Sequence, residues 1–309
     1  MIASRRRFLG ILAGSAAALA APEAHAAAYR WRGRALGAEV SLTLAHPDRA
    51  AAEAAVEACL DEVERLEALF SLYHPDSALG RLNRTGLLED PGHDMVRLLS
   101  QAQAIARLTG GAFDVTMQPL WRLHAAGAPD ADAVRDCLRR VGHRGLQVSP
   151  RRIALARPGM ALSLNGIAQG YITDRVTGML RRRGFGHALV NLGEYRSTGQ
   201  KDSAGSPWPV AAPGGRVLDI NGGAVATSAG AGLSFDPAGR RHHILDPRLG
   251  RSPNRFASVT VTVATATLAD ALSTAFYVMD AEQARAVRAR LSGVAVLAEG
   301  IRPPAAARP

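Results

Sequence analysis

The chain has 309 residues, of which 47% are hydrophobic and 21% charged, an ordinary globular composition with enough length for one large domain or two lobes. The formal net charge is +10, and all but one of the basic residues are arginine. Because these arginines are scattered, without a basic patch interleaved with aromatic residues, nucleic-acid binding is disfavoured, whereas the positive charge favours an anionic ligand.

Residues 1–26 contain the three parts of an export signal in the right order. Residues 4–9 read Ser-Arg-Arg-Arg-Phe-Leu, which matches the twin-arginine pattern, and an apolar run to about Ala21 and an Ala-His-Ala cleavage site at 24–26 follow. The apolar run is too short to span a bilayer comfortably. We therefore expect residues 1–26 to be removed and the protein to act in a bacterial periplasm.

The next part of the chain predicts a strand, two helices and two candidate binding loops. Residues 36–44 alternate as a half-buried strand does, and 50–69 carry apolar side chains at the spacing of an amphipathic helix. A loop over 70–83 mixes aromatic, polar and turn residues, and a helix over 94–109 leads to two glycines at 110–111. Both segments could approach a ligand, but a helix connection with Tyr73 in the core and a plain helix end are the alternatives.

Residues 117–147 are mostly helical in pattern, and strands are predicted near Ile153 and over 160–164. A glycine-bearing turn at 165–170 then opens a helix that reaches about Arg183, with Asn165 as its N-cap. Such a turn presents N–H groups to anions. A Gly-x-x-x-Gly spacing is, however, equally common where helices merely pack closely.

Residues 188–195 predict a strand that runs into a glycine turn, and short strands continue to about Ser228. The pair His242 and His243 lies near Asp246 and suggests zinc. Adjacent side chains of a strand point to opposite faces, so both histidines could not bind one metal ion. A single histidine acting as acid, base or phosphate ligand fits better.

Residues 259–279 change from strand-like alternation to a helical pattern that contains one carboxylate, Asp270. Thr274 lies one turn further on the same face, and the two oxygens suit a hard cation such as Mg²⁺. Alternatively, Thr267 and Asp270 form a capping box, which the helix considered alone favours.

The chain ends with a predicted helix over 281–291, a strand over 294–297 and a tail over 301–309 whose Pro, Ala and Arg content predicts disorder. The two cysteines, Cys59 and Cys137, could form a disulfide in an oxidising compartment or remain as buried free thiols.

Several of these stretches, taken in order, resemble the flavin transferases of the ApbE family, which move FMN from FAD onto a Thr or Ser of another protein. The resemblance covers roughly residues 35–298. It implies an α+β fold of two interlocked lobes with FAD in the cleft, built from a single domain over 27–300. The blocks that carry it lie at 70–83, 111–116, 164–174, 189–193, 226–228, 243–247 and 269–274.

The resemblance also implies the site residues, and it reverses the preference for a cap at Asp270. Asp270 and Thr274 would bind Mg²⁺ by side chain, and Ala168 by its backbone carbonyl. His243 becomes the candidate base or phosphate contact and, with Asp270, the candidate catalytic residue. The implied FAD contacts are Leu36, Tyr73, Ala112, Phe113, Asp114, Asn165, Tyr171 and Ile244.

Three positions depart from the family pattern. Gln169 stands where many members have Lys, Leu36 where Met is usual, and Glu194 with Tyr195 where Gly-Asp is usual. The Gly-Glu-Tyr-Arg run at 193–196, together with the export signal, resembles the accessory flavin transferases of nitrous oxide respiration called NosX.

The function implied by the resemblance is Mg²⁺-dependent transfer of FMN from FAD to a Thr or Ser hydroxyl of a periplasm-facing flavoprotein, with release of AMP. The acceptor would be a membrane-bound respiratory subunit. Two alternatives remain open: hydrolysis of FAD to FMN and AMP, and a flavin-binding or chaperone protein without turnover. The presence of Asp270, Thr274 and His243 argues against the last, while Gln169 leaves it open.

Overall fold

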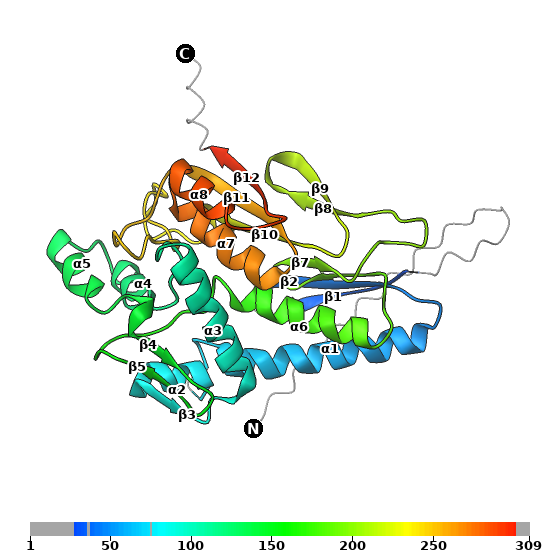
Figure 1. The fold of residues 1–309 in the computed structure, drawn as a ribbon, viewed down its shortest axis with the longest axis horizontal. Helices are drawn as coiled ribbons and strands as arrows, with labels where there is room; N and C mark the ends of the chain where they lie inside the picture. Colours follow the sequence, from blue (N-terminus) through cyan, green and yellow to red (C-terminus); the bar gives the residue numbers. More distant parts are fainter. Residues whose placement is uncertain (1–27, 36–37, 75, 301–309) are drawn as a thin grey trace, which may run out of the picture.

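The computed structural model describes residues 28–35, 38–74 and 76–300. The predicted export signal over 1–26, Leu36 and the tail over 301–309 lie outside the described residues. The largest element is a seven-stranded sheet in the order β1-β2-β6-β7-β10-β11-β12, with every neighbouring pair antiparallel (Figure 1). Its strands are β1 (Ala28–Ala35), β2 (Ala38–Ala45), β6 (Ala188–Asn191), β7 (Tyr195–Ser197), β10 (Ala224–Ala229), β11 (Phe256–Val263) and β12 (Ala295–Gly300).

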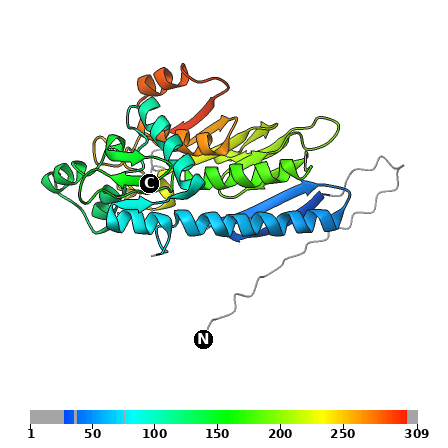
Figure 2. The same cartoon turned by 60° about the horizontal axis from the view of Figure 1, so that its bottom comes forward.

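Three long helices share the core with this sheet: α1 (Arg49–Phe70), α6 (Ala168–Arg182) and α7 (Ala266–Val278). Helix α7 packs on β10 and β11 and against α6, and α6 in turn packs against α1. Figures 1 and 2 show α1 and α6 running side by side. The buried valines of β11 and the buried leucines of β2 belong to one hydrophobic core with these helices. Helix α7 is buried on almost every side, which explains why most of its side chains are apolar.

Smaller elements form a second region at the opposite end of the molecule from β1 (Figure 1). Its helices are α2 (Ala78–Thr85), α3 (Gly92–Leu108), α4 (Gln118–Ala125) and α5 (Ala131–Leu138). A three-stranded sheet, β3-β5-β4, joins them, with strands β3 (Leu87–Glu89), β4 (Leu146–Val148) and β5 (Arg152–Leu155). A separate hairpin, β8 (Trp208–Ala212) with β9 (Arg216–Ile220), and helix α8 (Ala281–Arg288) complete the fold.

The α+β prediction is confirmed, but several local predictions are wrong. The segment 160–164 contributes only an isolated bridge, between Ala161 and Met117, because the chain there is an irregular buried connection. Strand β1 was missed, since its alternation with arginines follows directly on the predicted export signal. Cys59 and Cys137 are both free and buried, in separate hydrophobic clusters. None of the described helices is long and apolar enough to cross a membrane.

Candidate functional site

Helices α6 and α7 approach each other closely because α6 carries a glycine at the contact. A Cβ atom at Gly170 would lie 2.3 Å from the carbonyl oxygen of Ala266 and 2.9 Å from Cβ of Asp270. Any larger residue would therefore push the two helices apart. The close-packing interpretation of the Gly-x-x-x-Gly spacing holds for this glycine.

Each of these two helices caps the first turn of the other. Oδ2 of Asp270, on α7, accepts a hydrogen bond from the backbone N–H of Gly170 at 3.0 Å. Asp174, on α6, accepts from the N–H groups of Ala266 at 2.7 Å and Thr267 at 3.0 Å. Free N–H groups and the positive end of the helix dipole make a carboxylate favourable at both places.

The predicted capping details were consequently wrong. Helix α7 begins two residues earlier than the Thr267–Asp270 box requires, with Thr265 as its N-cap, so Asp270 lies in the second turn and caps a different helix. Asn165 is not the N-cap of α6 either: Ile167 is, and it makes no side-chain cap. The carboxylate of Asp270, 100 residues from Gly170 in sequence, caps α6 in place of Asn165.

A cavity of about 360 Å³ opens beside this helix junction. Its volume falls in the range of small-molecule sites. It gathers most of the predicted site residues from four separate stretches of the chain. Those that line it are Ala112, Phe113, Asp114, Asn165, His243, Ile244, Asp270 and Thr274.

Three predicted residues that the structure describes do not line this cavity. Tyr171 is buried, and its hydroxyl donates to Oδ1 of Asp94 at 2.7 Å, so its side chain serves the core. Tyr73 is 83% exposed on its loop, which also excludes the alternative that it is a core residue. Ala168 is the first residue of α6 and does not line the cavity. Leu36 lies outside the described residues.

Asp114 lines the cavity, yet both of its oxygens bind its own surroundings. Oδ1 accepts from the N–H and the hydroxyl of Thr116, and Oδ2 from the N–H of His143 at 2.6 Å. Asp114 therefore fixes the shape of the loop that carries Ala112 and Phe113.

Besides Asp114, two further buried carboxylates, Asp270 and Glu194, line the cavity, and no Arg or Lys of the described residues lines it. Burial raises the pKa of Asp270, and the nearby charge of Asp174 raises it further against the opposing effect of the Gly170 N–H. Burial also raises the pKa of Glu194 well above its usual range, and repulsion by Asp270 adds to this. Uncompensated negative charge in a buried site favours a cation or a proton.

Sequence reasoning noted Glu194 only as a departure from the family pattern. The signal that could have found it is an acidic residue in a glycine turn, directly after the strand over 188–191.

The oxygen donors around Asp270 fit a hard metal ion. The hydroxyl of Thr274 lies 3.2 Å from that of Ser228, which is itself 2.8 Å from the hydroxyl of Ser273. Within the described ranges no group of three or more His, Cys, Asp or Glu side chains could hold a metal. A site made of the Asp270 carboxylate and the neighbouring hydroxyls needs no such group, because hard oxygen ligands are what Mg²⁺ prefers.

The two adjacent histidines have different surroundings. Nδ1 of His243 lies 3.2 Å from the carbonyl oxygen of Leu233, and because a carbonyl only accepts, Nδ1 carries the proton and Nε2 is an acceptor. Burial lowers the pKa of His243, which favours this neutral form. His242 is 1% exposed, its Nε2 bonds to the carbonyl of Pro253, and its ring packs on Tyr277. Only His243 faces the cavity.

Comparison with known proteins identifies the family. A sequence model of the ApbE family matches residues 36–298. The chain belongs to the ApbE family. Among ApbE relatives, the FAD:protein FMN transferase of Klebsiella pneumoniae (strain 342) is 30% identical over 290 residues, covering 85% of this chain and 82% of its own. That of Treponema pallidum (strain Nichols) is 31% identical over 287 residues, covering 81% and 78%.

Solved ApbE structures share the fold. The apo form of the Pseudomonas stutzeri flavinyl transferase ApbE aligns with a TM-score of 0.81 and 27% identity, covering 92% of this chain and 94% of that one. The apbe protein of Thermotoga maritima aligns with a TM-score of 0.77 and 29% identity, covering 88% and 94%. The resemblance inferred from the sequence blocks is thereby confirmed, and placement in the NosX-like subgroup stays a prediction.

Proposed function

We propose that this protein is an FAD:protein FMN transferase, which moves FMN from FAD to a Thr or Ser hydroxyl of another protein and releases AMP. The observation that carries the proposal is the cavity at the junction of α6 and α7. There, in a chain of the ApbE family, Asp270, Thr274 and His243 meet the loop of Ala112 and Phe113.

The walls of the cavity suit the parts of FAD. Ala112, Phe113 and Ile244 offer buried apolar surface for the flavin ring. Asn165 and Gly166 lie in the turn before α6, where N–H groups and the helix dipole favour phosphate oxygens. Gln169, on the first turn of α6, gives a neutral amide donor at the position where many ApbE members place a Lys.

Asp270 and Thr274 would hold Mg²⁺ through their side chains; the carbonyl of Ala168, the third ligand that the resemblance implies, does not line the cavity. The ion, when bound, supplies positive charge that neutralises the pyrophosphate of FAD. The chain's own contribution is to hold the Asp270 carboxylate in place through the N–H of Gly170. Gly170 thus ties the geometry of that carboxylate to the packing of the two helices.

His243 would remove the proton of the acceptor hydroxyl. The hydroxyl oxygen forms a bond to the phosphorus of the FMN half, the pyrophosphate P–O bond breaks, and AMP leaves with the electron pair. The hydroxyl proton moves to Nε2 of His243, which the Nδ1–H to Leu233 bond keeps free of its own proton.

The test is incubation with FAD, Mg²⁺ and an acceptor peptide, followed by intact mass measurement of the peptide and quantification of AMP. The proposal expects a covalent FMN adduct and equal AMP, both abolished by EDTA. Release of FMN and AMP without any adduct would identify an FAD hydrolase instead. Binding of FAD without release of AMP would leave only a flavin-binding protein.

The location of the reaction follows from the sequence signal alone. We propose that residues 1–26 direct export by the twin-arginine route and that the acceptor is a flavoprotein facing the periplasm, such as a membrane-bound respiratory subunit. Proteins exported by this route are already folded, which suits an enzyme whose site spans most of its chain.

A further inference from the structure

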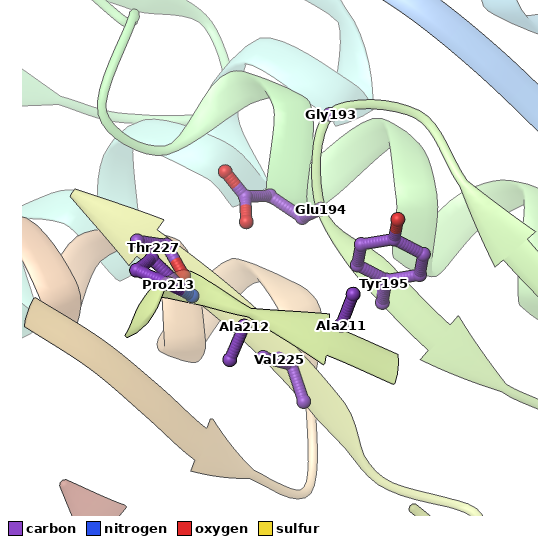
Figure 3. Close-up of a pocket in the computed structure, with 8 residues that line it drawn as sticks. All are labelled: Gly193, Glu194, Tyr195, Ala211, Ala212, Pro213, Val225 and Thr227. Atoms are coloured by element: carbon purple, nitrogen blue, oxygen red, sulfur yellow. The ribbon is translucent and has the colours of Figure 1, made fainter. Parts of the chain in front are cut away.

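A second cavity, of about 280 Å³, lies next to the first (Figure 3). It is enclosed by the turn before β7, by β10 and by the end of hairpin β8–β9. Two residues, Glu194 and Thr227, line both cavities, so the two spaces share a wall. The residues lining the second cavity are Gly193, Glu194, Tyr195, Ala211, Ala212, Pro213, Val225 and Thr227.

The second cavity occupies a gap in the large sheet. Strand β10 has six residues but pairs with β7 only at Ala224 and Val225, because the chain turns away at Gly193 and Glu194. On the side of β10 that faces β7, the carbonyl of Gly223 accepts a hydrogen bond from the N–H of Ser197. Further along the same side, the N–H of Thr227 donates to the carboxyl group of Glu194. Alternate residues of β10 thus direct main-chain groups into the gap, where Glu194 binds the N–H of Thr227 and no strand among the described residues pairs with β10 beyond Val225. An open strand of this kind is suited to an extended peptide.

The side chains that line the gap are mostly small and uncharged. Gly193, Ala211, Ala212 and Pro213 leave room for a main chain with small side chains. The exception is Glu194, which is 8% exposed. In Figure 3 its carboxylate points away from the ring of Tyr195, toward the side on which Thr227 lies.

The lining of the second cavity selects among the possible occupants. Only the first cavity is lined by Asp270 and Thr274, the side chains proposed to hold the Mg²⁺ that would neutralise a pyrophosphate, so the second cavity does not suit the pyrophosphate of FAD. The carboxyl group of Glu194 can form a hydrogen bond with a neutral hydroxyl whether or not it is ionised. The proposed reaction needs such a hydroxyl, on another protein, to reach the wall of the first cavity.

We infer that the second cavity binds the hydroxyl-bearing segment of the acceptor protein, as an extended chain along Thr227, with its Thr or Ser hydroxyl beside Glu194 on the shared wall. This inference rests on the proposed function. It places acceptor and FAD on opposite sides of the wall formed by Glu194 and Thr227.

The test places a bulky side chain in the second cavity by substituting an exposed residue, whose side chain the core does not require. Ala211 is exposed on β8 yet lines the cavity, so Ala211→Trp should occupy the gap without disturbing the core. Asp219→Trp is the matched control, because Asp219 is exposed on the paired strand β9 and does not line the cavity. Ala212→Phe fills the same space and replaces the first variant if that one does not fold.

The probe is a pool of acetylated nonapeptides with a central Thr flanked by Ala, Gly or Ser, and the most rapidly modified member is then used alone. Ala211→Trp should raise the KM for this peptide by about tenfold or more, the size expected when a bulky side chain overfills a fitted space. The affinity for FAD, followed by flavin fluorescence, should stay unchanged, as should both quantities in Asp219→Trp.

The outcomes separate this inference from the proposed function. Peptide modification by Ala211→Trp with an unchanged KM would overturn the acceptor site and leave the transferase intact. Loss of FAD binding in Ala211→Trp would also overturn it, since the cavities would not serve separate ligands. A wild-type protein that binds FAD but modifies no peptide in the pool would overturn the transferase, and the acceptor site with it.

Discussion

At the scale of single residues, Asp270 combines two roles, since its carboxylate caps α6 and faces the cavity. Asp270→Asn keeps an oxygen for the Gly170 N–H but removes the charge that holds a hard cation. We expect this variant to fold, to lose FMN transfer and to show no rise in Tm with Mg²⁺ and FAD, because a ligand stabilises only the state that binds it. Loss of a cap alone would lower stability by only about 1 kcal/mol, independently of metal.

Thr274→Val provides the graded comparison for Asp270, with a weaker loss because a neutral hydroxyl contributes less than a carboxylate. Asp270→Asn protein that modifies its acceptor at the normal Mg²⁺ requirement would refute the metal assignment. The cap of α6 would then be the remaining role of Asp270.

His243 gives a second prediction at this scale. If Nε2 accepts the acceptor's proton, His243→Ala should slow transfer by about 10²- to 10⁴-fold, the usual range for general base catalysis, with little change in FAD affinity. Near-normal rates with weakened FAD binding would make His243 a phosphate ligand instead. His242→Ala is the contrasting variant: its ring is buried on Tyr277, so its loss should lower Tm.

At the scale of helices, the contact between α6 and α7 depends on Gly170. Gly170→Ala should destabilise the protein by about 1–3 kcal/mol in urea unfolding, because the added Cβ meets backbone that cannot move alone. Gly178→Ala, in the same helix, is the matched control. Its Cβ would meet only the end of the flexible Arg182 side chain, at 3.4 Å, so it should stabilise by about 0.5–1 kcal/mol. Equal effects of the two substitutions would contradict the close-contact argument.

An ion-pair network joins α1, α3 and α6 and should make stability depend on pH. Hydrogen bonds from Arg65 and Arg175 hold the pKa of Glu62 below its usual range, and those from Tyr171 and Arg65 outweigh the effect of burial on Asp94. A carboxyl whose pKa is lower in the folded state stabilises it above the unfolded pKa, about 4.3 for Glu, and this is lost as pH falls through the folded value. The stability difference between wild type and Glu62→Gln should therefore be largest above about pH 5 and shrink below pH 4. A constant difference in urea titrations across that range would argue against the network.

The elements also show how far the sequence predicts this fold. Helices α1, α6 and α7 were predicted from their apolar spacing, because each buries one face or nearly all of its surface. Strands near Ile153, over 188–195 and over 294–297 were also predicted and correspond to β5, β6 and β12. Strand β1, the pairing of the strands and the ends of the helices were not predicted, since pairing and capping depend on partners far along the chain. Asn165 is a good local cap, but Asp270 takes that position across 100 residues. Tyr171 has the spacing of a core residue, and only the family pattern suggested that it binds FAD.

At the scale of the whole molecule, export can be tested without any assay of activity. Replacing both Arg5 and Arg6 by Lys should leave the precursor in the cytoplasm, because the twin-arginine pattern is the address that the export machinery recognises. Cell fractionation with immunoblotting measures this. Mature periplasmic protein in cells that lack the twin-arginine pathway would contradict the assignment.

The reciprocal caps of α6 and α7 also bear on how the protein acquires its ligand. The hydrogen bonds that join Asp270 to Gly170 and Asp174 to Ala266 span 100 and 92 residues of sequence. Closing loops of such length costs conformational entropy and slows folding. A nascent chain that ends before α7 lacks one partner of each bond and cannot assemble this junction. A ligand held there stabilises the entire domain at once, and its tight retention would report that synthesis and folding are complete.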